Sequence, residues 1–281
     1  MSKIPHVFMQ TTKKDPVDDY VLNMIQLQLD NTWTYEHYND ESILKFFKEN
    51  PVDDLPDIVN KFYSFKSGAH RADLFRYYYL YVKGGFYLDS DAMVYHNMND
   101  IIKDYEFVSV YSCMAGFIFQ GILGASPKHE IMKKALYNAY NTDPSVIENF
   151  YMYWCQDLYN IVKNTKIDNT IKIYKERYIK SCGDETVDDN NIVLFRHYPK
   201  TKIIPRGPIG RTYNWCAGNI TFIDASTIRT SWGMGNYKFL DDVTVEANWR
   251  EYSHIIVFNQ SYTAYLSIRK NDLLREQGSL M

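Results

Sequence analysis

The sequence predicts an α/β fold, and three observations lead to this prediction. Short apolar segments alternate with segments of helical periodicity along the 281 residues, which is typical of strands connected by helices. Apolar residues make up 46% of the chain, and a chain of this length can bury most of its apolar surface. No linker of biased composition and no internal repeat is evident. We therefore expect a single domain over residues 1–281.

The individual elements follow from local patterns. Residues 3–9 form an apolar segment that predicts a buried strand, and Asp15 before Pro16 is typical of a helix start. Alternation over 33–38 predicts a second strand. A helix over 67–83 is the most clearly marked, because two glycines follow it. Further helices are expected over 128–140, 145–163 and 267–277, and further strands over 86–89, 107–112, 116–120, 170–174, 192–195 and 255–258.

Charge and composition exclude several classes of protein. With 31 Lys and Arg against 34 Asp and Glu, the net charge of −3 leaves no basic footprint for nucleic acid. No stretch approaches the ~18 consecutive apolar residues of a transmembrane helix. The N-terminal residues lack the apolar region and cleavage site of a signal peptide. The four cysteines form no C-x-x-C pair, which predicts reduced thiols and a cytoplasmic protein.

Two aspartates follow the predicted strand at 86–88. Asp89 and Asp91 lie on the same side of an extended chain, and ligands of open α/β sheets bind at the carboxyl ends of strands. Two carboxylates there form an oxygen site suited to Mg²⁺ or Mn²⁺, ions that proteins typically share with substrate phosphates. A polar turn after a strand is the alternative, because a D-x-D pattern alone is common.

The helix before this strand carries a polar stripe. Asp73, Arg76 and Tyr77 share one helical face at spacings of three and four residues. In a functional interpretation, Asp73 holds sugar or ribose hydroxyls and Arg76 lies near phosphate or sugar oxygens, because arginine suits bidentate recognition of oxyanions. An ordinary ion pair between Asp73 and Arg76 is the alternative.

These two features together resemble a known signature. The pattern R-x-D-x-x-R-Y at 71–77, followed by G-G-x-Y-L-D-x-D at 84–91, is similar to the DxD signature of a sugar-transferase family. That family, of the glycosyltransferase family 32 type, includes capsular-polysaccharide sugar transferases and is related to the glucosylating clostridial toxins. Weaker likeness extends to residues 4–10, 116–129 and 231–232.

The resemblance implies both a fold and an activity. The fold is of the GT-A type, a Rossmann-like single domain with a mixed, mostly parallel sheet. Its donor-binding part covers about 1–130, and its acceptor and closing-loop part covers about 131–281. The activity is that of a retaining glycosyltransferase, which moves a hexose from a nucleotide-sugar, UDP-linked by preference, to a glycan, lipid-linked or protein acceptor. Polysaccharide biosynthesis in the cytoplasm of a bacterial cell or a virus-infected host, with optional peripheral membrane association, is the expected setting.

The resemblance also implies roles for single residues. Asp89 and Asp91 would hold the divalent metal, Mn²⁺ or Mg²⁺, with Asp89 also contacting the donor sugar or ribose. Asp73 and Arg76 would hold the donor sugar and phosphate, and Tyr87 would lie against the donor. The other donor-binding positions would be Gln10, Thr11, Arg71 and Gln120.

Near the C-terminal end the sequence departs from the family pattern. Trp232 would lie on a mobile loop that closes over the diphosphate and excludes water. Five residues earlier, the family has His or Glu as a further metal ligand, whereas this chain has Thr227. Thr227 would act through a water, or Thr230 would take the metal instead. This departure keeps open a catalytically silent carbohydrate-binding domain of the same fold. A D-x-D phosphohydrolase is disfavoured, because in that class of enzyme the D-x-D motif follows the first strand, whereas here it lies at residues 89–91.

Overall fold

The computed structural model describes residues 3–12, 29, 31–90, 92–94, 96–177, 185–197, 207–215, 218–240, 243–259 and 262–281. The chain divides into two compact units where the sequence analysis expected one domain. Described residues 3–12 and 31–197 belong to the first unit, and those from residue 207 onward belong to the second. Each unit has its own hydrophobic core. The predicted division into donor and acceptor parts near residue 130 stays a prediction.

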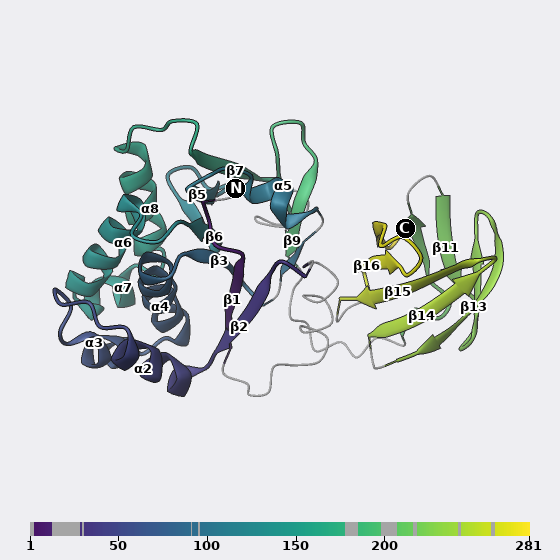
Figure 1. Cartoon of the computed structure of the whole chain (residues 1–281), viewed down its shortest axis with the longest axis horizontal. Helices are drawn as coiled ribbons and strands as arrows, with labels where there is room; N and C mark the ends of the chain where they lie inside the picture. Colours follow the sequence, from purple (N-terminus) through teal and green to yellow (C-terminus); the bar gives the residue numbers. More distant parts are fainter. Residues whose placement is uncertain are drawn as a thin grey trace. The chain divides into compact units, whose positions relative to one another are not determined.

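The first unit contains a mixed sheet of nine strands (Figure 1). Its strands, in spatial order, are β2 (Thr34–Tyr38), β1 (Val7–Thr11), β3 (Gly85–Leu88), β6 (Ile118–Ala125), β5 (Phe107–Tyr111), β7 (Ile171–Arg177), β8 (Glu185–Val187), β9 (Val193–His197) and β4 (Ala92–Val94). A mixed sheet was expected, but the expectation that it is mostly parallel was wrong. In the described part of this sheet only β1–β2, β1–β3 and β5–β7 pair in parallel. The other pairings are antiparallel, because β6 runs back between β3 and β5 and the strands from β7 onward form a meander.

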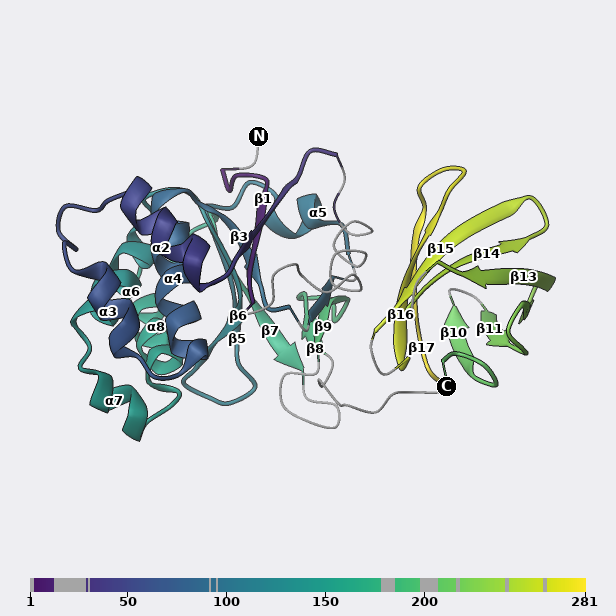
Figure 2. The ribbon, with the colours of Figure 1, turned by 90° about the horizontal axis from the view of Figure 1, so that it is seen from below.

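Most helices of this unit gather on one side of the sheet (Figures 1 and 2). Helix α4 (Gly68–Val82) matches the helix predicted over 67–83 and begins at Ser67, whose side chain accepts from the Ala69 amide. The others are α2 (Asp40–Glu49), α3 (Ile58–Ser64), α5 (Met98–Ile102), α6 (Glu130–Asn141), α7 (Pro144–Asn149) and α8 (Tyr153–Lys163). Tyr78 and Tyr79 of α4 are fully buried among these helices and the sheet, so this helix is central to the core.

The second unit is an antiparallel sheet whose two edges meet. Its strands, in order, are β10 (Thr212–Trp215), β11 (Gly218–Phe222), β12 (Thr227–Thr230), β13 (Gly233–Phe239), β14 (Thr244–Trp249), β15 (Tyr252–Phe258), β16 (Ala264–Arg269) and β17 (Arg275–Ser279). A bridge between Tyr213 and Leu280, and a bond from the Met281 amide to the Thr212 carbonyl (3.0 Å), join the first strand to the last. The sheet therefore closes into an eight-stranded barrel.

Two expectations for this part of the chain were wrong. The helix expected over 267–277 is instead the hairpin of β16 and β17, with Ser267 paired to Glu276. An internal repeat is also present: the pattern W-x-x-G-N-x-x-F-x-D-x-x-T occupies residues 215–227 and again 232–244. A third tryptophan, Trp249, follows at the same spacing of 17 residues. Each repeat spans one strand pair, so the tryptophans recur at the same end of the barrel.

Two further findings concern the helices and the cysteines. None of the described helices is long and apolar enough to cross a membrane. Cys155 is free, but Cys113 is disulfide-bonded, so the expectation of reduced thiols was wrong for Cys113. Because disulfides persist mainly in oxidising compartments, this bond counts against the cytoplasmic location, which stays a prediction.

Candidate active site

Three strands of the first unit bring polar side chains to one sheet edge. Strands β1 and β3 are parallel, with Phe8 opposite Phe86, so their carboxyl ends meet at the same edge. The buried Gln10 on β1 donates from Nε2 to the carbonyl oxygens of Leu88 (3.1 Å) and Asp89 (3.4 Å). Strand β6 runs antiparallel to β3, so it begins where β3 ends. The predicted location of Asp89, at the exit of a buried strand, is confirmed.

Two glycines allow the chain to pass from α4 directly into β3. Gly84 and Gly85 have φ values of 69° and 112°, which side chains with a Cβ rarely adopt. A Cβ on Gly84 would lie 2.8 Å from the Ala125 carbonyl oxygen, and one on Gly85 would lie 2.9 Å from the Val7 carbonyl oxygen. The glycine pair therefore ends the helix and also lets β3 fit between β1 and β6.

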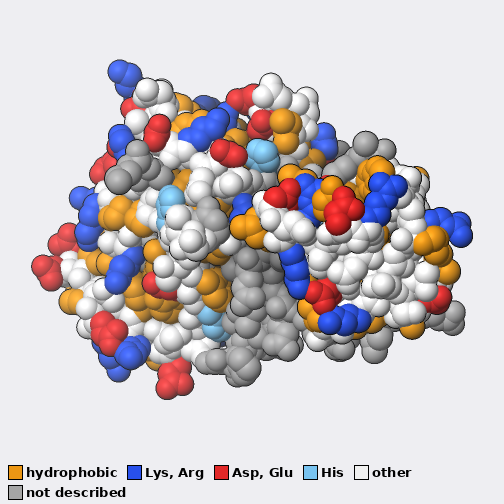
Figure 3. Space-filling view, turned by 45° about the vertical axis from the view of Figure 1, so that its right-hand side comes forward, with side chains coloured by type: hydrophobic (Ala, Val, Ile, Leu, Met, Phe, Trp, Pro, Cys, Tyr) orange, Lys and Arg blue, Asp and Glu red, His pale blue; other side chains and the backbone are white. Residues whose placement is uncertain are grey.

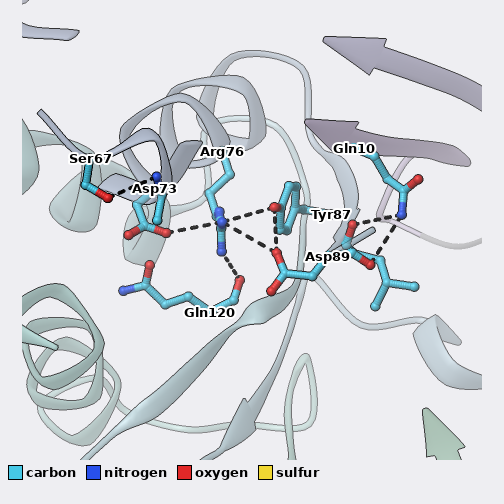
Figure 4. Close-up of polar contacts among 9 residues, drawn as sticks. Gln10, Ser67, Asp73, Arg76, Tyr87, Asp89 and Gln120 are labelled. Atoms are coloured by element: carbon cyan, nitrogen blue, oxygen red, sulfur yellow. Dashed lines mark hydrogen bonds and ion pairs between the residues drawn. The ribbon is translucent and has the colours of Figure 1, made fainter. Parts of the chain in front are cut away.

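The centre of the site is the Arg76 guanidinium on α4 (Figure 4). Its Nη2 lies 3.2 Å from Asp73 Oδ1 and 3.6 Å from Asp89 Oδ1, and its Nη1 donates to the Gln120 carbonyl oxygen at 2.5 Å. Arg76 is only 5% exposed. The predicted pair of Asp73 and Arg76 is thus more than a surface ion pair, because Asp89 from the next strand joins it.

Tyr87 connects the helix to the aspartate. Its hydroxyl donates to Asp89 Oδ1 at 2.7 Å and accepts from Arg76 Nη2 at 3.0 Å. The guanidinium also lies over the Tyr87 ring, 4.0 Å from its centre, in a cation–π contact. Tyr87 and Asp89 are two residues apart, so both face α4, and the tyrosine fixes the orientation of the carboxylate.

The cluster contains two carboxyl groups and one guanidinium. Burial raises the pKa of the Asp73 carboxyl, and the neighbouring Arg76 opposes that rise. Burial also disfavours the charged guanidinium, but Tyr87, Asp73 and Asp89 together raise the pKa of Arg76, which therefore stays charged. When both carboxyls are ionised, the cluster has one negative charge in excess, and such an excess favours a bound cation or hydroxyl donors.

The space beside Asp89 depends on Gly121 of β6, which the sequence analysis did not single out. A Cβ on Gly121 would lie 2.5 Å from Asp89 Oδ2 and 2.3 Å from the Phe119 ring. The Gly121 carbonyl also accepts from the Asp89 amide at 2.9 Å. In the sequence, only the resemblance of residues 116–129 to the family had drawn attention to this segment. No residue there gave a signal that the glycine matters for the site.

Several polar atoms around the cluster are buried without a hydrogen-bond partner in the described part of the chain. They are both amide atoms of Gln120, the Tyr77 hydroxyl and Arg76 Nε. Burying such atoms without a partner is costly, so they indicate room for a polar ligand or water. Cys155 of α8 is another neighbour that the sequence analysis missed, since burial raises its pKa to about 12 and it interacts electrostatically with Asp73.

Two predicted donor-site residues of the first unit, Thr11 and Arg71, lie at or beyond the margin of the cluster. Thr11 ends β1, and its side chain hydrogen-bonds to Tyr87, so it adjoins the cluster. Arg71 instead pairs with Asp40 of α2 at 3.2 Å and lies over the Phe62 ring of α3, so its contacts are with the helical layer. Asp91 lies outside the described residues.

Thr227 and Trp232 belong to the second unit. Thr227 begins β12, and its amide donates to Asp224 Oδ1 at 2.8 Å. Trp232 lies in the two-residue turn between β12 and β13, 39% exposed, with its ring 6.2 Å from that of Trp215. Their predicted roles as metal ligand and closing residue stay predictions.

The donor chemistry of the site fits a divalent cation in type. Carboxylate oxygens are the ligands that Mg²⁺ and Mn²⁺ prefer, and Asp89, one third exposed, presents its carboxylate at the sheet edge. Within the described residues no group of three His, Cys, Asp or Glu side chains converges as a complete metal site. A metal here would therefore be completed by Asp91, water or substrate oxygens, as is usual for Mg²⁺.

Comparison with known proteins shows what this part of the chain is similar to. Residues 14–108 match the model of the glycosyltransferase sugar-binding region containing a DXD motif. The chain is 27% identical over 143 residues to inositol phosphoceramide mannosyltransferase 1 of Schizosaccharomyces pombe, covering 49% of this chain and 43% of that protein. It is 24% identical over 163 residues to the uncharacterized glycosyltransferase L373 of Acanthamoeba polyphaga mimivirus, covering 56% and 63%.

Two further comparisons are more partial. Mannosyl phosphorylinositol ceramide synthase SUR1 of Saccharomyces cerevisiae is 27% identical over 135 residues, covering 47% of this chain and 34% of that protein. The solved structure of PaToxG glycosyltransferase has 10% identity and a TM-score of 0.42, covering 56% of this chain and 67% of that one. The chain thus spans between about a third and two thirds of its curated relatives. Residues 14–108 thus match the DXD-containing sugar-transferase family that the sequence resembles.

Proposed function

We propose that this protein is a retaining, metal-dependent glycosyltransferase of the GT-A type that moves a hexose from a nucleotide-sugar to an acceptor hydroxyl. The observation that carries the proposal is the buried cluster of Asp73, Arg76 and Asp89 at the carboxyl end of β3. It lies within the segment that matches the family model. Unpartnered buried polar atoms beside it are what a site for sugar hydroxyls requires.

Each residue of the cluster has a distinct task in this proposal. The Asp73 carboxylate accepts hydrogen bonds from hydroxyls of the donor sugar. The Gln120 side-chain amide both donates to and accepts from these hydroxyls. Arg76 remains charged and holds Asp73 and Asp89 in place from within the core. Asp89, oriented by Tyr87, would hold the metal together with Asp91. Mn²⁺ or Mg²⁺, when bound there, supplies positive charge to the diphosphate oxygens.

The reaction balances without a protein nucleophile. The bond between the anomeric carbon and the diphosphate oxygen breaks, and the acceptor oxygen bonds to that carbon on the same face. The acceptor proton goes to the departing phosphate oxygen, so the products are the glycoside and a nucleoside diphosphate. A donor that fills the space around Arg76 would displace water, which would otherwise hydrolyse the donor.

Mannose is the sugar that we place first. Two of the three relatives are named for mannose transfer to inositol phosphoceramide, so we propose GDP-mannose ahead of the UDP-sugars that the sequence analysis favoured. A glycolipid is then the first acceptor to test, with glycan and protein acceptors after it.

A donor panel tests the proposal. The full chain is incubated with GDP-mannose, UDP-glucose, UDP-galactose, UDP-N-acetylglucosamine or UDP-N-acetylgalactosamine, each with Mn²⁺, Mg²⁺ or EDTA, and the released nucleoside diphosphate is measured. We expect slow release of nucleoside diphosphate from one of these donors, and only when Mn²⁺ or Mg²⁺ is present. Absence of release and of donor-induced thermal stabilisation across the panel would favour the catalytically silent carbohydrate-binding domain. Release of phosphate from simple monoesters would favour the phosphohydrolase.

A further inference from the structure

The barrel of the second unit gathers tryptophans at one end. Three of the five tryptophans of the chain, Trp215, Trp232 and Trp249, are spaced by 17 residues. Trp215 ends β10, Trp232 lies in the turn after β12, and Trp249 ends β14. Because neighbouring strands are antiparallel, every second strand runs in the same direction. The three side chains therefore lie at the same end of the barrel.

Glycines of the repeat leave the space that lets these rings pack closely. A Cβ on Gly218 would lie 2.5 Å from Ser231 Oγ and 3.3 Å from the Trp232 ring, and one on Gly235 would lie 2.8 Å from Trp249 Cβ. The glycine three residues after each tryptophan thus makes room for the next tryptophan. At the third position of the array the glycine is replaced by Tyr252, so the packing ends there.

The tryptophans differ in exposure. Trp215 and Trp249 are 1% and 6% exposed, with ring centres 4.7 Å apart, whereas Trp232 packs edge-on against Trp215 and is 39% exposed. The Trp232 amide is also fixed by a bond to Thr230 Oγ1 at 3.2 Å. An indole that is fixed in place and partly exposed offers a flat aromatic surface with a polar N–H, which suits recognition of a ligand.

Polar groups lie directly behind the rings. Glu276 Oε2 accepts from Trp215 Nε1 at 2.5 Å and lies 3.7 Å from His254 Nδ1. His254 stacks on Trp249 at 4.3 Å and is buried, and its Nδ1 has no hydrogen-bond partner in the described residues. Ser267, the cross-strand neighbour of Glu276, is equally buried, and its hydroxyl also has no partner among the described residues.

We propose that this end of the barrel, formed by Trp215, Trp232, Trp249, His254, Ser267 and Glu276, binds a saccharide. Sugars combine apolar C–H faces with hydroxyls, which matches exposed indole surface backed by a carboxylate, an imidazole and a hydroxyl. Eight-stranded barrels are wide enough to hold one small ligand at the mouth. Burial lowers the pKa of His254 to about 4, so the ring is neutral near pH 7 and can both donate and accept.

The face of the molecule drawn in Figure 3 carries acidic and basic side chains side by side on the second unit. The outer side of the barrel is consistent with this mixture, since Lys238 and Lys270 both pair with Glu246. Such a mixed surface offers no single-sign field for a polyanion, which favours a neutral ligand. This site belongs to the second unit, whereas the Asp89 cluster belongs to the first, and the proposal does not depend on the proposed transferase activity. The proposal also gives Trp232 a role, as the exposed tryptophan of the repeat that contacts the saccharide.

The test is a titration of the full chain with mannobiose, maltose, lactose and chitobiose, followed by tryptophan fluorescence and calorimetry. One of these disaccharides is expected to bind with at least tenfold lower affinity in Trp232→Ala, while Met234→Ala, an exposed neighbour on β13, binds as the wild type does. Ser267→Ala removes a hydroxyl without a protein partner, so the fold is expected to stay intact while affinity falls at least threefold.

Asp89→Asn separates this proposal from the proposed function. It is expected to abolish nucleoside diphosphate release and to leave disaccharide binding unchanged. Absence of binding for all four disaccharides at millimolar concentration would overturn the proposal, as would wild-type affinity in both Trp232→Ala and Ser267→Ala. Loss of binding in Asp89→Asn would assign the sugar to the donor site instead and would also overturn it.

Discussion

The cores of the two units differ in the kind of side chain that surrounds their buried polar groups. The first unit buries charge: Arg76 is surrounded by Asp73, Asp89 and the Tyr87 hydroxyl. The second unit buries aromatic rings: Trp215, Trp249 and a histidine pack together around a single carboxylate. A buried ion cluster loses much stability when its central charge is removed, whereas an aromatic cluster loses stability in proportion to the ring removed. The difference suggests where each unit is most sensitive to mutation.

Removing the cation from the first cluster should have the largest effect. Arg76→Met leaves Asp73 and Asp89 facing each other without a counter-charge, which we expect to cost about 3–5 kcal/mol of unfolding free energy. The matched control is Lys45→Met, which breaks the exposed pair with Glu49 and should cost less than about 1 kcal/mol. Urea denaturation monitored by circular dichroism measures both. Equal costs would mean that the buried cluster is no more important to stability than a surface pair.

In the second unit, the effect should follow burial along the repeat. Trp249→Ala removes an almost fully buried ring and should lower the unfolding free energy by about 3–5 kcal/mol. Trp232→Ala removes a more exposed ring and should lower it by about 1 kcal/mol or less. Thermal denaturation of the full chain, with the transitions of both variants compared, tests this order. A reversed order would show that Trp232 is a core residue and would remove the basis for a binding role.

These sensitivities also show what the sequence could predict. The 71–91 segment was interpretable because its helix, glycine pair, strand and aspartates are consecutive, so local spacing alone places Asp73, Arg76 and Asp89 together. Gly121 and Cys155 come from elements far along the chain, and their contribution depends on a tertiary approach that no local pattern encodes. Arg71 shares the motif but faces α2 and α3, because it lies on another stripe of α4.

Apart from the strand predicted over 255–258, which is part of β15, the second unit was missed for a different reason. Its strands are short, and segments such as Ser267–Ile268–Arg269 carry mixed polarity that resembles a helix when no partner strand is considered. The repeat was the available signal, since identical W-x-x-G-N patterns 17 residues apart predict stacked hairpins. Likewise, the reversal of β6 between β3 and β5 depends on pairing, so the sequence suggested a more parallel sheet than exists.

A smaller effect should separate orientation from charge in the first cluster. Tyr87→Phe removes the hydroxyl between Arg76 and Asp89 but keeps the ring under the guanidinium. We expect a loss of about 1–2 kcal/mol in stability and a reduction in kcat that exceeds the change in donor affinity, because Asp89 remains but is less well oriented. Steady-state kinetics with the active donor measure this. A change in donor affinity alone would make Tyr87 a binding residue.

A pH effect should also appear in the second unit. The pKa of His254 is about 4 in the folded protein because of burial, below its ordinary value near 6.5. Between these values the unfolded state binds more protons, so stability is complete above pH ~6.5 and falls as pH decreases towards 4. Melting temperatures between pH 7 and pH 5 should therefore fall more steeply in the wild type than in His254→Phe. Parallel curves would contradict a buried neutral histidine.

The most direct test of the central claim concerns Asp89, which joins the cluster to the substrate. Nucleoside diphosphate release is measured with the active donor and metal for the wild type, for Asp89→Asn and for Asp53→Asn, an exposed aspartate that serves as the control. We expect Asp89→Asn to keep its fold, since Tyr87 can still donate to Oδ1, and to lose at least ~100-fold of the release rate. Asp53→Asn should match the wild type. Undiminished release by a folded Asp89→Asn variant would contradict the assignment of this cluster as the donor site.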